Sequence, residues 1–273
     1  DQYVSALEDY EDGLLVGTTK GAYLFDFTTE QFKKLDDKIN STIYNFSLDG
    51  DHNVWISTAG QGLFRYNLNT HECRNYQIKG SKGNVACTLV DVNNQVWALS
   101  NNAGATLQRL NKSNDTFYPF RLKGDATQLN GMAMLANSDG SILVGTWDQG
   151  LYQVEPDGTT KLLVSASLSN SMHHIHKLLN DRNLFVLIGC DEGLIEYDIQ
   201  KGTWRMLSEV NDPSKSSAER FVYSITADRE GGLWIGTFYG GVNYIPSLSF
   251  ESRFNMYPAS LNGLSGMPSV AFG

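Results

Sequence analysis

Two short segments carry large aromatic side chains beside hydrogen-bonding groups, a combination that suits carbohydrate binding. Trp147-Asp148 and Phe238-Tyr239 stand where the equivalent loops elsewhere in the chain hold small polar residues. Aromatic faces stack on the CH faces of sugar rings, and neighbouring polar side chains bond the hydroxyls. We therefore predict ligand contacts at Trp147, Asp148, Phe238 and Tyr239. Packing of each loop against a neighbouring sheet is the alternative interpretation.

One segment is rich in histidine, which is a common zinc ligand. The residues are His173, His174 and His176. Strand alternation places His174 and His176 on one face, but no Cys or carboxylate close in the sequence completes a ligand set. Neutral, partly buried histidines are the favoured interpretation, with His173 and His174 kept as ligand-binding candidates. No metal site and no cofactor are predicted.

Further polar candidates lie in comparable segments of the chain. Arg220 either clamps a carboxylate of a ligand or pairs with Glu219 or Asp228 as a surface group. The remaining binding candidates are Tyr44, Asn130, Asp191 and Glu192.

Catalytic motifs are absent from the sequence, and no catalytic residue is predicted. It contains no GxSxG, HExxH, P-loop or GxGxxG after a strand. Two carboxylates from distant segments can nevertheless act as an acid–base pair. Asp148 and Glu192 are the nominal pair, so a secreted glycosidase or lyase is the alternative function. A protein-interaction scaffold with a wide apolar face is the third.

A degenerate repeat positions all these residues. Short apolar segments such as Leu233-Trp-Ile-Gly-Thr237 recur, and aligning the residue before the Thr-like position gives anchors at residues 17, 57, 99, 145, 189 and 236. The spacing is therefore 40 to 47 residues. Each copy has an apolar strand before the anchor segment, and a glycine and an alternating strand after it. A fourth strand rich in aromatic residues follows, and we place it at residues 32–35, 73–76, 117–120, 204–207 and 250–257. Four-stranded units of this length predict the blades of a β-propeller.

The repeats also account for a row of aspartates between the first and second strands. A cation site is one interpretation, because hard cations prefer clustered oxygens. The stronger interpretation is structural, because Asp bonds its own backbone in tight turns. The residues concerned are Asp12, Asp49, Asp51, Asp91, Asp139, Asp181 and Asp228.

The repeat resembles that of the two-component regulator propeller family. The clearest copy, Val222–Val242, contains Asp-x-x-Gly-Gly-Leu-Trp-Ile-Gly-Thr and then Gly-Gly-Val, and residues 254–270 resemble the family's inter-repeat linker. The resemblance covers essentially the whole chain. It implies an all-β propeller of six repeats plus the first strand of a seventh at residues 269–273, six- or seven-bladed. Residues 1–273 are then one propeller or most of one, as a fragment of a longer sensor ectodomain.

The same resemblance implies a function and partners. Such propellers form the periplasmic sensor part of hybrid two-component systems, so we expect an oligosaccharide ligand and a signal to a cytoplasmic histidine kinase outside this chain. The implied partners are a further propeller and a β-domain of the same polypeptide, and a homodimer in the full-length sensor. The full-length protein is then anchored in the inner membrane.

The net charge, the apolar segments and the cysteines limit the classes of partner and site that we expect. The net charge of −9 repels polyanions, which disfavours nucleic acid and favours a neutral sugar. The longest apolar run, Leu184–Ile188, is too short to span a bilayer, so we predict no membrane insertion by this segment. The chain starts at Asp1 without a signal peptide, and we interpret it as a processed or excised piece. The three cysteines indicate no disulfide scaffold but leave a Cys73–Cys87 bridge open.

Overall fold

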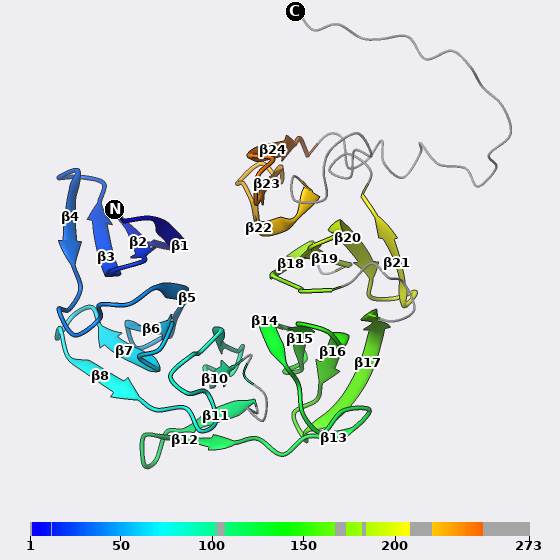
Figure 1. Cartoon of the computed structure of the whole chain (residues 1–273), viewed down its shortest axis with the longest axis horizontal. Helices are drawn as coiled ribbons and strands as arrows, with labels where there is room; N and C mark the ends of the chain where they lie inside the picture. The colour runs from blue at the N-terminus through cyan, green and yellow to red at the C-terminus, as the bar shows by residue number, and fades with distance from the viewer. Residues whose placement is uncertain are drawn as a thin grey trace, which may run out of the picture.

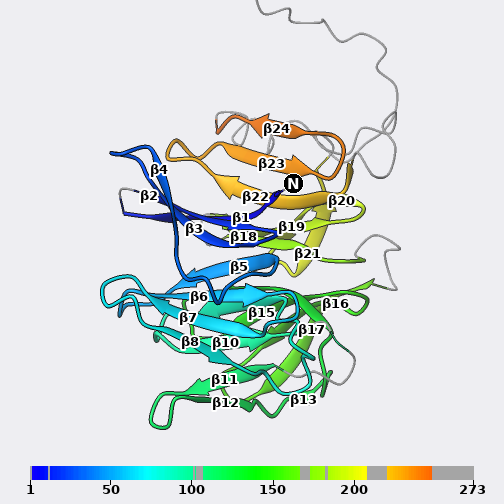
Figure 2. The same ribbon diagram turned by 60° about the vertical axis from the view of Figure 1, so that its left-hand side comes forward.

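Six β-sheets follow one another around a central axis (Figure 1), each tilted against the next (Figure 2). The computed structural model describes residues 2–11, 13–100, 102, 107–166, 173–181, 184–207 and 220–247, and all the elements bounded below are β-strands. We number the sheets blade 1 to blade 6 in chain order. The predicted all-β propeller with six repeats is confirmed, and the strand predicted for a seventh lies outside the described residues.

Blades 1 to 3 are four-stranded antiparallel meanders. Blade 1 contains β1 (Val4–Tyr10), β2 (Gly13–Thr18), β3 (Gly21–Asp26) and β4 (Gln31–Lys34). Blade 2 contains β5 (Ile43–Leu48), β6 (Asn53–Thr58), β7 (Leu63–Asn67) and β8 (Cys73–Tyr76). Blade 3 contains β9 (Cys87–Val90), β10 (Val96–Leu99), β11 (Gln108–Asn111) and β12 (Thr116–Pro119).

Blades 4 to 6 vary this plan. Blade 4 contains β13 (Lys123–Gly124), β14 (Gly131–Ala136), β15 (Ile142–Thr146), β16 (Gly150–Val154) and β17 (Thr159–Ser165), with β13 parallel to β17 at the outer edge. Blade 5 contains β18 (Lys177–Asp181), β19 (Phe185–Cys190), β20 (Gly193–Asp198) and β21 (Thr203–Met206). Within the described residues, blade 6 contains β22 (Val222–Ala227), β23 (Leu233–Thr237) and β24 (Val242–Ile245). Its predicted fourth strand, at residues 250–257, lies outside them.

The core lies between the blades. Leu15 of blade 1 packs with Ile43 and Phe46 of blade 2, and Trp55 of blade 2 packs with Val96 of blade 3. The middle strands therefore bury both faces, which explains why they are almost continuously apolar. Each large side chain buried in this way contributes on the order of 2 kcal/mol to the free energy of folding.

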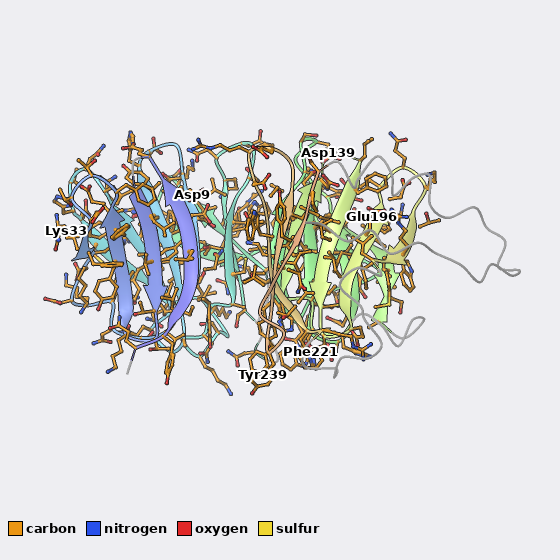
Figure 3. The ribbon with its side chains drawn as sticks, turned by 90° about the horizontal axis from the view of Figure 1, so that it is seen from above. Asp9, Lys33, Asp139, Glu196, Phe221 and Tyr239 are labelled. Carbon is orange, nitrogen blue, oxygen red and sulfur yellow. The ribbon has the colours of Figure 1, made fainter. Side chains whose placement is uncertain are left out.

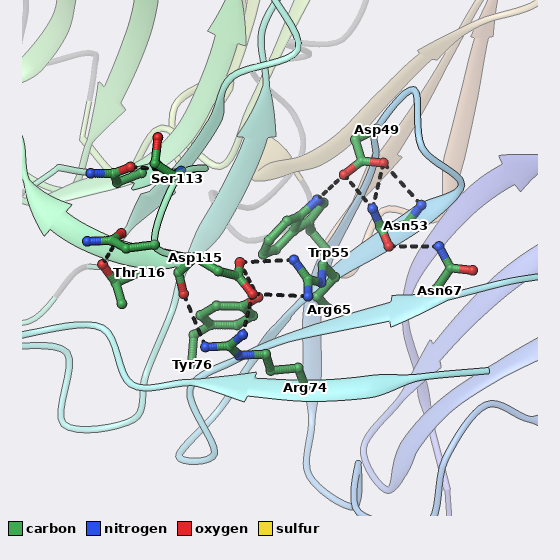
Figure 4. A network of polar contacts seen from close by, with 12 residues as sticks. Asp49, Asn53, Trp55, Arg65, Asn67, Arg74, Tyr76, Ser113, Asp115 and Thr116 are labelled. Carbon is green, nitrogen blue, oxygen red and sulfur yellow. Dashed lines mark hydrogen bonds and ion pairs between the residues drawn. The ribbon is translucent and has the colours of Figure 1, made fainter. Parts of the chain in front are cut away.

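In blades 2, 3 and 6 the aspartate of the first turn forms a structural clamp on a tryptophan. Asp49 accepts hydrogen bonds from the Trp55 indole Nε1 at 2.8 Å and from the Asn53 backbone N at 3.1 Å (Figure 4). The same aspartate–indole bond recurs between Asp91 and Trp97 in blade 3, at 2.8 Å. These contacts agree with the structural interpretation of the aspartates, whereas Asp12 lies outside the described residues. Among the residues described, no three His, Cys, Asp or Glu side chains are placed to hold a metal ion.

We expect Asp49→Ala to lower the free energy of unfolding by about 1–2 kcal/mol, because it leaves the Trp55 indole N–H, in a side chain only 1% exposed, without its acceptor. Urea denaturation followed by circular dichroism measures the change. Asp51→Ala is the matched control in the same turn, because the exposed Asp51 side chain accepts no hydrogen bond from the residues described. Equal losses in the two variants would contradict the clamp.

A charged network ties blade 2 to blade 3. The Asp115 carboxylate of the blade 3 turn accepts bonds from Arg65 at 2.9 Å, from Tyr76 at 2.8 Å and from Arg74 (Figure 4). The Arg65 guanidinium also lies over the Trp55 ring, 5.7 Å from its centroid. Burial and the bond to Asp115 raise the pKa of Tyr76, so its hydroxyl stays protonated and donates.

The cysteines are all free thiols, and no Cys73–Cys87 bridge forms. Burial raises the pKa of Cys87 to about 11 and that of Cys190 to about 12, which makes both thiols unreactive at neutral pH. In the described part of the chain, no helix has the length and apolar character needed to cross a membrane.

Candidate functional site

Two kinds of loop meet at one rim of the propeller, namely those joining the second and third strands and those leading into the first strand. Phe221 and Tyr239 mark this rim in Figure 3, and Asp139 marks the opposite one. Both loop types carry predicted binding residues. The fold therefore brings to one rim segments that lie far apart in the sequence.

The blade 4 loop that carries Trp147 is tightly closed. The Thr146 hydroxyl donates to the Gly150 carbonyl at 2.7 Å, and the Trp147 backbone N donates to the Asn130 carbonyl at 2.8 Å. The Trp147 carbonyl in turn accepts the His174 backbone N–H at 2.8 Å. Trp147 is thus held at the junction of blades 4 and 5, with 39% of its surface exposed.

Aromatic rings form a series from blade 4 to blade 6. Trp147 lies 3.8 Å from the His174 ring, centroid to centroid, and His176 stacks on Tyr223 at 3.9 Å. Tyr223 stacks on Phe238 at 5.2 Å, and Phe238 contacts Tyr239 at 4.5 Å. We call the set the aromatic track; its members are Trp147, His174, His176, Tyr223, Phe238 and Tyr239.

Asp191 organises the middle of the aromatic track. Its carboxylate bonds His174 Nδ1 and also His176 Nε2, the latter at 2.7 Å. An ionised carboxylate only accepts, so each imidazole turns an N–H toward it, and both tautomers are thereby fixed. Asp191 therefore holds two track members in place. Its neighbour Glu192 accepts the His173 backbone N–H at 3.2 Å.

Burial lowers the pKa of His176 below its ordinary value, and the smaller effect of Asp191 acts in the opposite direction. The unfolded chain then binds more protons at this residue than the folded one does as the pH falls toward and below about 6.5. We therefore expect the free energy of unfolding to fall on acidification from about pH 7.5 to 5.5, and to fall less in His176→Gln. Denaturant titrations at both pH values measure this difference. An equal or steeper fall in the variant would show that His176 does not contribute.

Several predicted residues stand apart from the aromatic track. Tyr44 is 46% exposed on blade 2, and Asp148 is exposed beside Trp147. In the parts of the chain that the structure covers, neither has a ring contact or hydrogen bond with the track. Asn130 Oδ1 and Arg220 Nε are buried and have no hydrogen-bond partner among the residues that the structure describes. The predicted pairing of Arg220 with Glu219 lies outside the described residues. Among the residues described, the Asp228 carboxylate accepts the Trp234 indole N–H at 3.3 Å, and no bond from Arg220 to it is found.

Tyr223 was not predicted from the sequence, and His176 was not among the predicted binding residues. A positional signal could have found both. In three repeats a buried aliphatic residue at the start of the first strand or just before it is followed by an aromatic residue or histidine, as in Ile43-Tyr44, Ile175-His176 and Val222-Tyr223. These residues lie where the innermost strand begins, at the rim.

Comparisons with known proteins agree with this architecture. Residues 216–239 match the model of the two component regulator propeller family. No curated protein matches the sequence. Among solved structures, the chain is similar to the extracellular domain of BT4673 from B. thetaiotaomicron, described as a hybrid two component system. The TM-score is 0.72 and the identity 20%, over 89% of this chain and 32% of that one.

Two other structures extend the comparison. The extracellular domain of BT3049 from B. thetaiotaomicron, also described as a hybrid two component system, gives a TM-score of 0.63 at 17% identity, over 89% of this chain and 40% of that one. Virginiamycin B lyase from Staphylococcus aureus gives 0.68 at 11% identity, over 90% and 85%. The chain thus spans about a third of the BT4673 structure, and these identities establish a common fold only. The protein is a six-bladed β-propeller, and one segment of it, residues 216–239, matches the two component regulator propeller model.

Proposed function

We propose that this chain is the extracytoplasmic ligand-sensing propeller of a hybrid two-component system and that its ligand is a neutral oligosaccharide bound on the aromatic track. The observation that carries the proposal is the track itself. Four of its rings remain exposed although they stack on neighbouring rings; Trp147 is 39% exposed, Tyr223 44%, Phe238 53% and Tyr239 73%. Exposed ring faces of this kind offer stacking surfaces for several successive sugar units.

The polar groups beside the rings support the same ligand class. With His174 Nδ1 turned to Asp191, the other ring nitrogen of this partly exposed side chain is left to hydrogen-bond hydroxyl groups. Asp148, which is exposed beside Trp147, and Glu192, which accepts the His173 backbone N–H, add carboxylate acceptors. The net charge of −9 disfavours sulfated and uronic sugars by general repulsion.

A ligand on the aromatic track contacts three blades at once, and this is how binding would produce a signal. Contacts to Trp147, His174 and Tyr223 bias the relative packing of blades 4, 5 and 6. Under the proposal that packing is read by a further propeller and a β-domain of the same polypeptide. A homodimer anchored in the inner membrane passes it to a cytoplasmic kinase. Phosphotransfer is assigned to that kinase and not to residues of this chain.

Isothermal titration calorimetry tests the proposal, with neutral hexasaccharides of glucose, xylose, mannose and arabinose as probes and a sulfated hexasaccharide as the charged control. We expect saturable binding of at least one neutral probe and unchanged sugar on chromatography afterwards. Shortened products that disappear in Asp148→Asn or Glu192→Gln would replace the sensor with a glycosidase or lyase. Binding of the sulfated probe alone, or of none, would contradict a neutral-sugar site.

A further inference from the structure

The outer strand of blade 5 has a free edge that carries large apolar side chains. β21 is the last strand of its sheet, and Trp204 and Met206 on it are 39% and 37% exposed. The Leu207 backbone N donates to the Leu194 carbonyl at 2.9 Å, so by the alternation of an antiparallel ladder the N–H and C=O groups of Trp204 and Met206 point away from β20. The edge therefore offers backbone donors and acceptors beside exposed apolar side chains.

The outer edges of blades 1 to 3 carry residues that commonly keep sheet edges from pairing with other chains. β4 and β8 hold exposed cations, Lys33 and Arg74, and β12 ends at Pro119. In β21 the one charged residue, Arg205, donates to the Glu196 carboxylate at 2.7 Å and is neutralised by it. The edge of blade 5 therefore lacks the protection that these three blades have.

Blade 4 shows how an outer edge of this propeller takes up a further strand. β13 lies outside the four-stranded meander and pairs in parallel with β17. The Lys123 backbone N donates to the Gly158 carbonyl at 3.0 Å, and the Asp125 backbone N donates to the Thr160 carbonyl at 3.2 Å. Figure 1 shows β13, β17 and β21 on the outer side of the ring. A short extended segment is therefore enough to cover such an edge.

A groove between blades 4 and 5 lies beside the free edge. Leu143 and Leu163 line it from blade 4, and Tyr197 and Ile199 line it from blade 5. Tyr197 is the strand partner of Trp204, so the groove adjoins β21. Its cavity of about 70 Å³ is several times the space that one water molecule needs, so it can admit an aliphatic side chain.

The polar lining of the groove adds a charge preference. Lys161 is exposed on β17, and its ammonium group has no ion pair with any residue that the structure describes. Gln153 and Asn137 complete the lining, and their amide groups already donate to Glu155 and Ser141. Lys161 is therefore the cation left to pair with a carboxylate of a bound segment.

We propose that the free edge of β21 and the adjoining groove bind an extended segment of a partner protein, which adds a fifth strand to blade 5. The backbone of the segment bonds the outward groups of Trp204 and Met206, an aliphatic side chain enters the groove, and an Asp or Glu side chain pairs with Lys161. Backbone pairing supplies affinity, and the two side-chain contacts supply selectivity. This surface lies on the outer wall, so the proposal does not depend on the oligosaccharide ligand of the aromatic track.

Selection of a phage-displayed library of random linear decapeptides on the protein tests the proposal, and NMR hydrogen exchange locates the tightest-binding peptide. We expect this peptide to alternate apolar residues and to carry an Asp or Glu. The amides of Trp204 and Met206 should exchange quickly in the free protein and slowly with the peptide bound, whereas the Arg205 amide, which faces β20, should change little. Unchanged exchange at Trp204 and Met206, or a selection that yields no binding peptide, would overturn the proposal.

Other occupants of the edge give different results. Slow exchange of the Trp204 and Met206 amides in the monomeric protein without peptide would mean that the chain covers its own edge. Self-association in sedimentation that disappears in Met206→Pro would mean that a second copy of the chain occupies it. Either outcome overturns the proposal of a peptide partner.

Two pairs of variants test the contacts separately, with affinity measured by fluorescence anisotropy of the labelled peptide and the fold checked by circular dichroism. Met206→Pro removes an outward N–H and the side chain beside it, and should weaken binding at least tenfold. Phe32→Pro is the matched control, because Phe32 is 63% exposed at the equivalent outward position of β4 in blade 1. Lys161→Gln should weaken binding about fivefold, and Lys33→Gln should leave it unchanged. Equal losses in the two proline variants, or none in Met206→Pro, would contradict binding at β21.

Discussion

Trp147→Ala is expected to weaken oligosaccharide binding by about thirtyfold, because removal of a central aromatic contact costs on the order of 2 kcal/mol. The indole is held at the junction of blades 4 and 5 by backbone bonds that the substitution keeps. Its ring packs on His174 and belongs to none of the buried core clusters of the described residues, so the fold should survive. Calorimetry with the tightest-binding neutral hexasaccharide measures the loss, and circular dichroism checks the fold.

Trp204→Ala is the matched control, because Trp204 is also 39% exposed but lies on the outer strand of blade 5, away from the aromatic track. It should leave the affinity unchanged. Trp147→Phe should recover part of the loss, because a smaller aromatic face remains for stacking. The same weakening in both alanine variants, or none in Trp147→Ala, would show that the ligand binds elsewhere.

Gly150→Ala is expected to lower the free energy of unfolding by on the order of 4 kcal/mol, the largest effect we predict for a single methyl group. Gly150 follows the Trp147 loop and has φ +99°, a conformation that L-residues rarely adopt. A Cβ there would lie 2.0 Å from the Val164 carbonyl oxygen, a backbone atom of the neighbouring strand that cannot move aside. Blade 4 must open or distort to admit it.

Gly241→Ala supplies the comparison at the equivalent turn of blade 6. Its φ is +73°, but a Cβ would meet nothing within 4 Å, so only the backbone conformation costs energy, about 1 kcal/mol. Urea denaturation of the two variants separates the contact from the conformation. A difference of less than about 1 kcal/mol between them would contradict the close approach of Val164 to Gly150.

The strand order and the number of blades could be predicted from the repeat. Each anchor segment is a buried strand that packs against the blades on both sides, so every copy of it is apolar. The fourth strand of blade 4, β17, was not identified because its outer position requires little apolar surface. Its sequence, Thr159–Ser165, lacks the aromatic residues that marked the other outer strands. The two-residue β13 that pairs with it was also beyond prediction, because so short a strand has no pattern of its own.

For the candidate site, the sequence could predict only which rim of the propeller each loop residue lies on, because strand topology determines that. Loop type alone places Trp147, His174 and Tyr239 on one rim. The bonds from Asp191 to His174 and His176 depend instead on how a blade 5 loop bends over its own first strand. The stacking of His176 on Tyr223 depends on the spacing between two blades. No local sequence motif encodes either contact. The bonds from Asp191 to the two histidines could therefore be recognised only in the folded structure.

The central claim, that the ligand lies on the aromatic track, is tested most directly by ¹⁹F NMR of protein labelled with 5-fluorotryptophan. The chain has five tryptophans, and single Trp→Phe variants assign the five signals. On titration with the binding hexasaccharide, the Trp147 signal should shift saturably with the calorimetric affinity, while those of Trp204 and the buried Trp55 stay in place. A saturable shift at Trp204 with Trp147 unchanged would contradict the account.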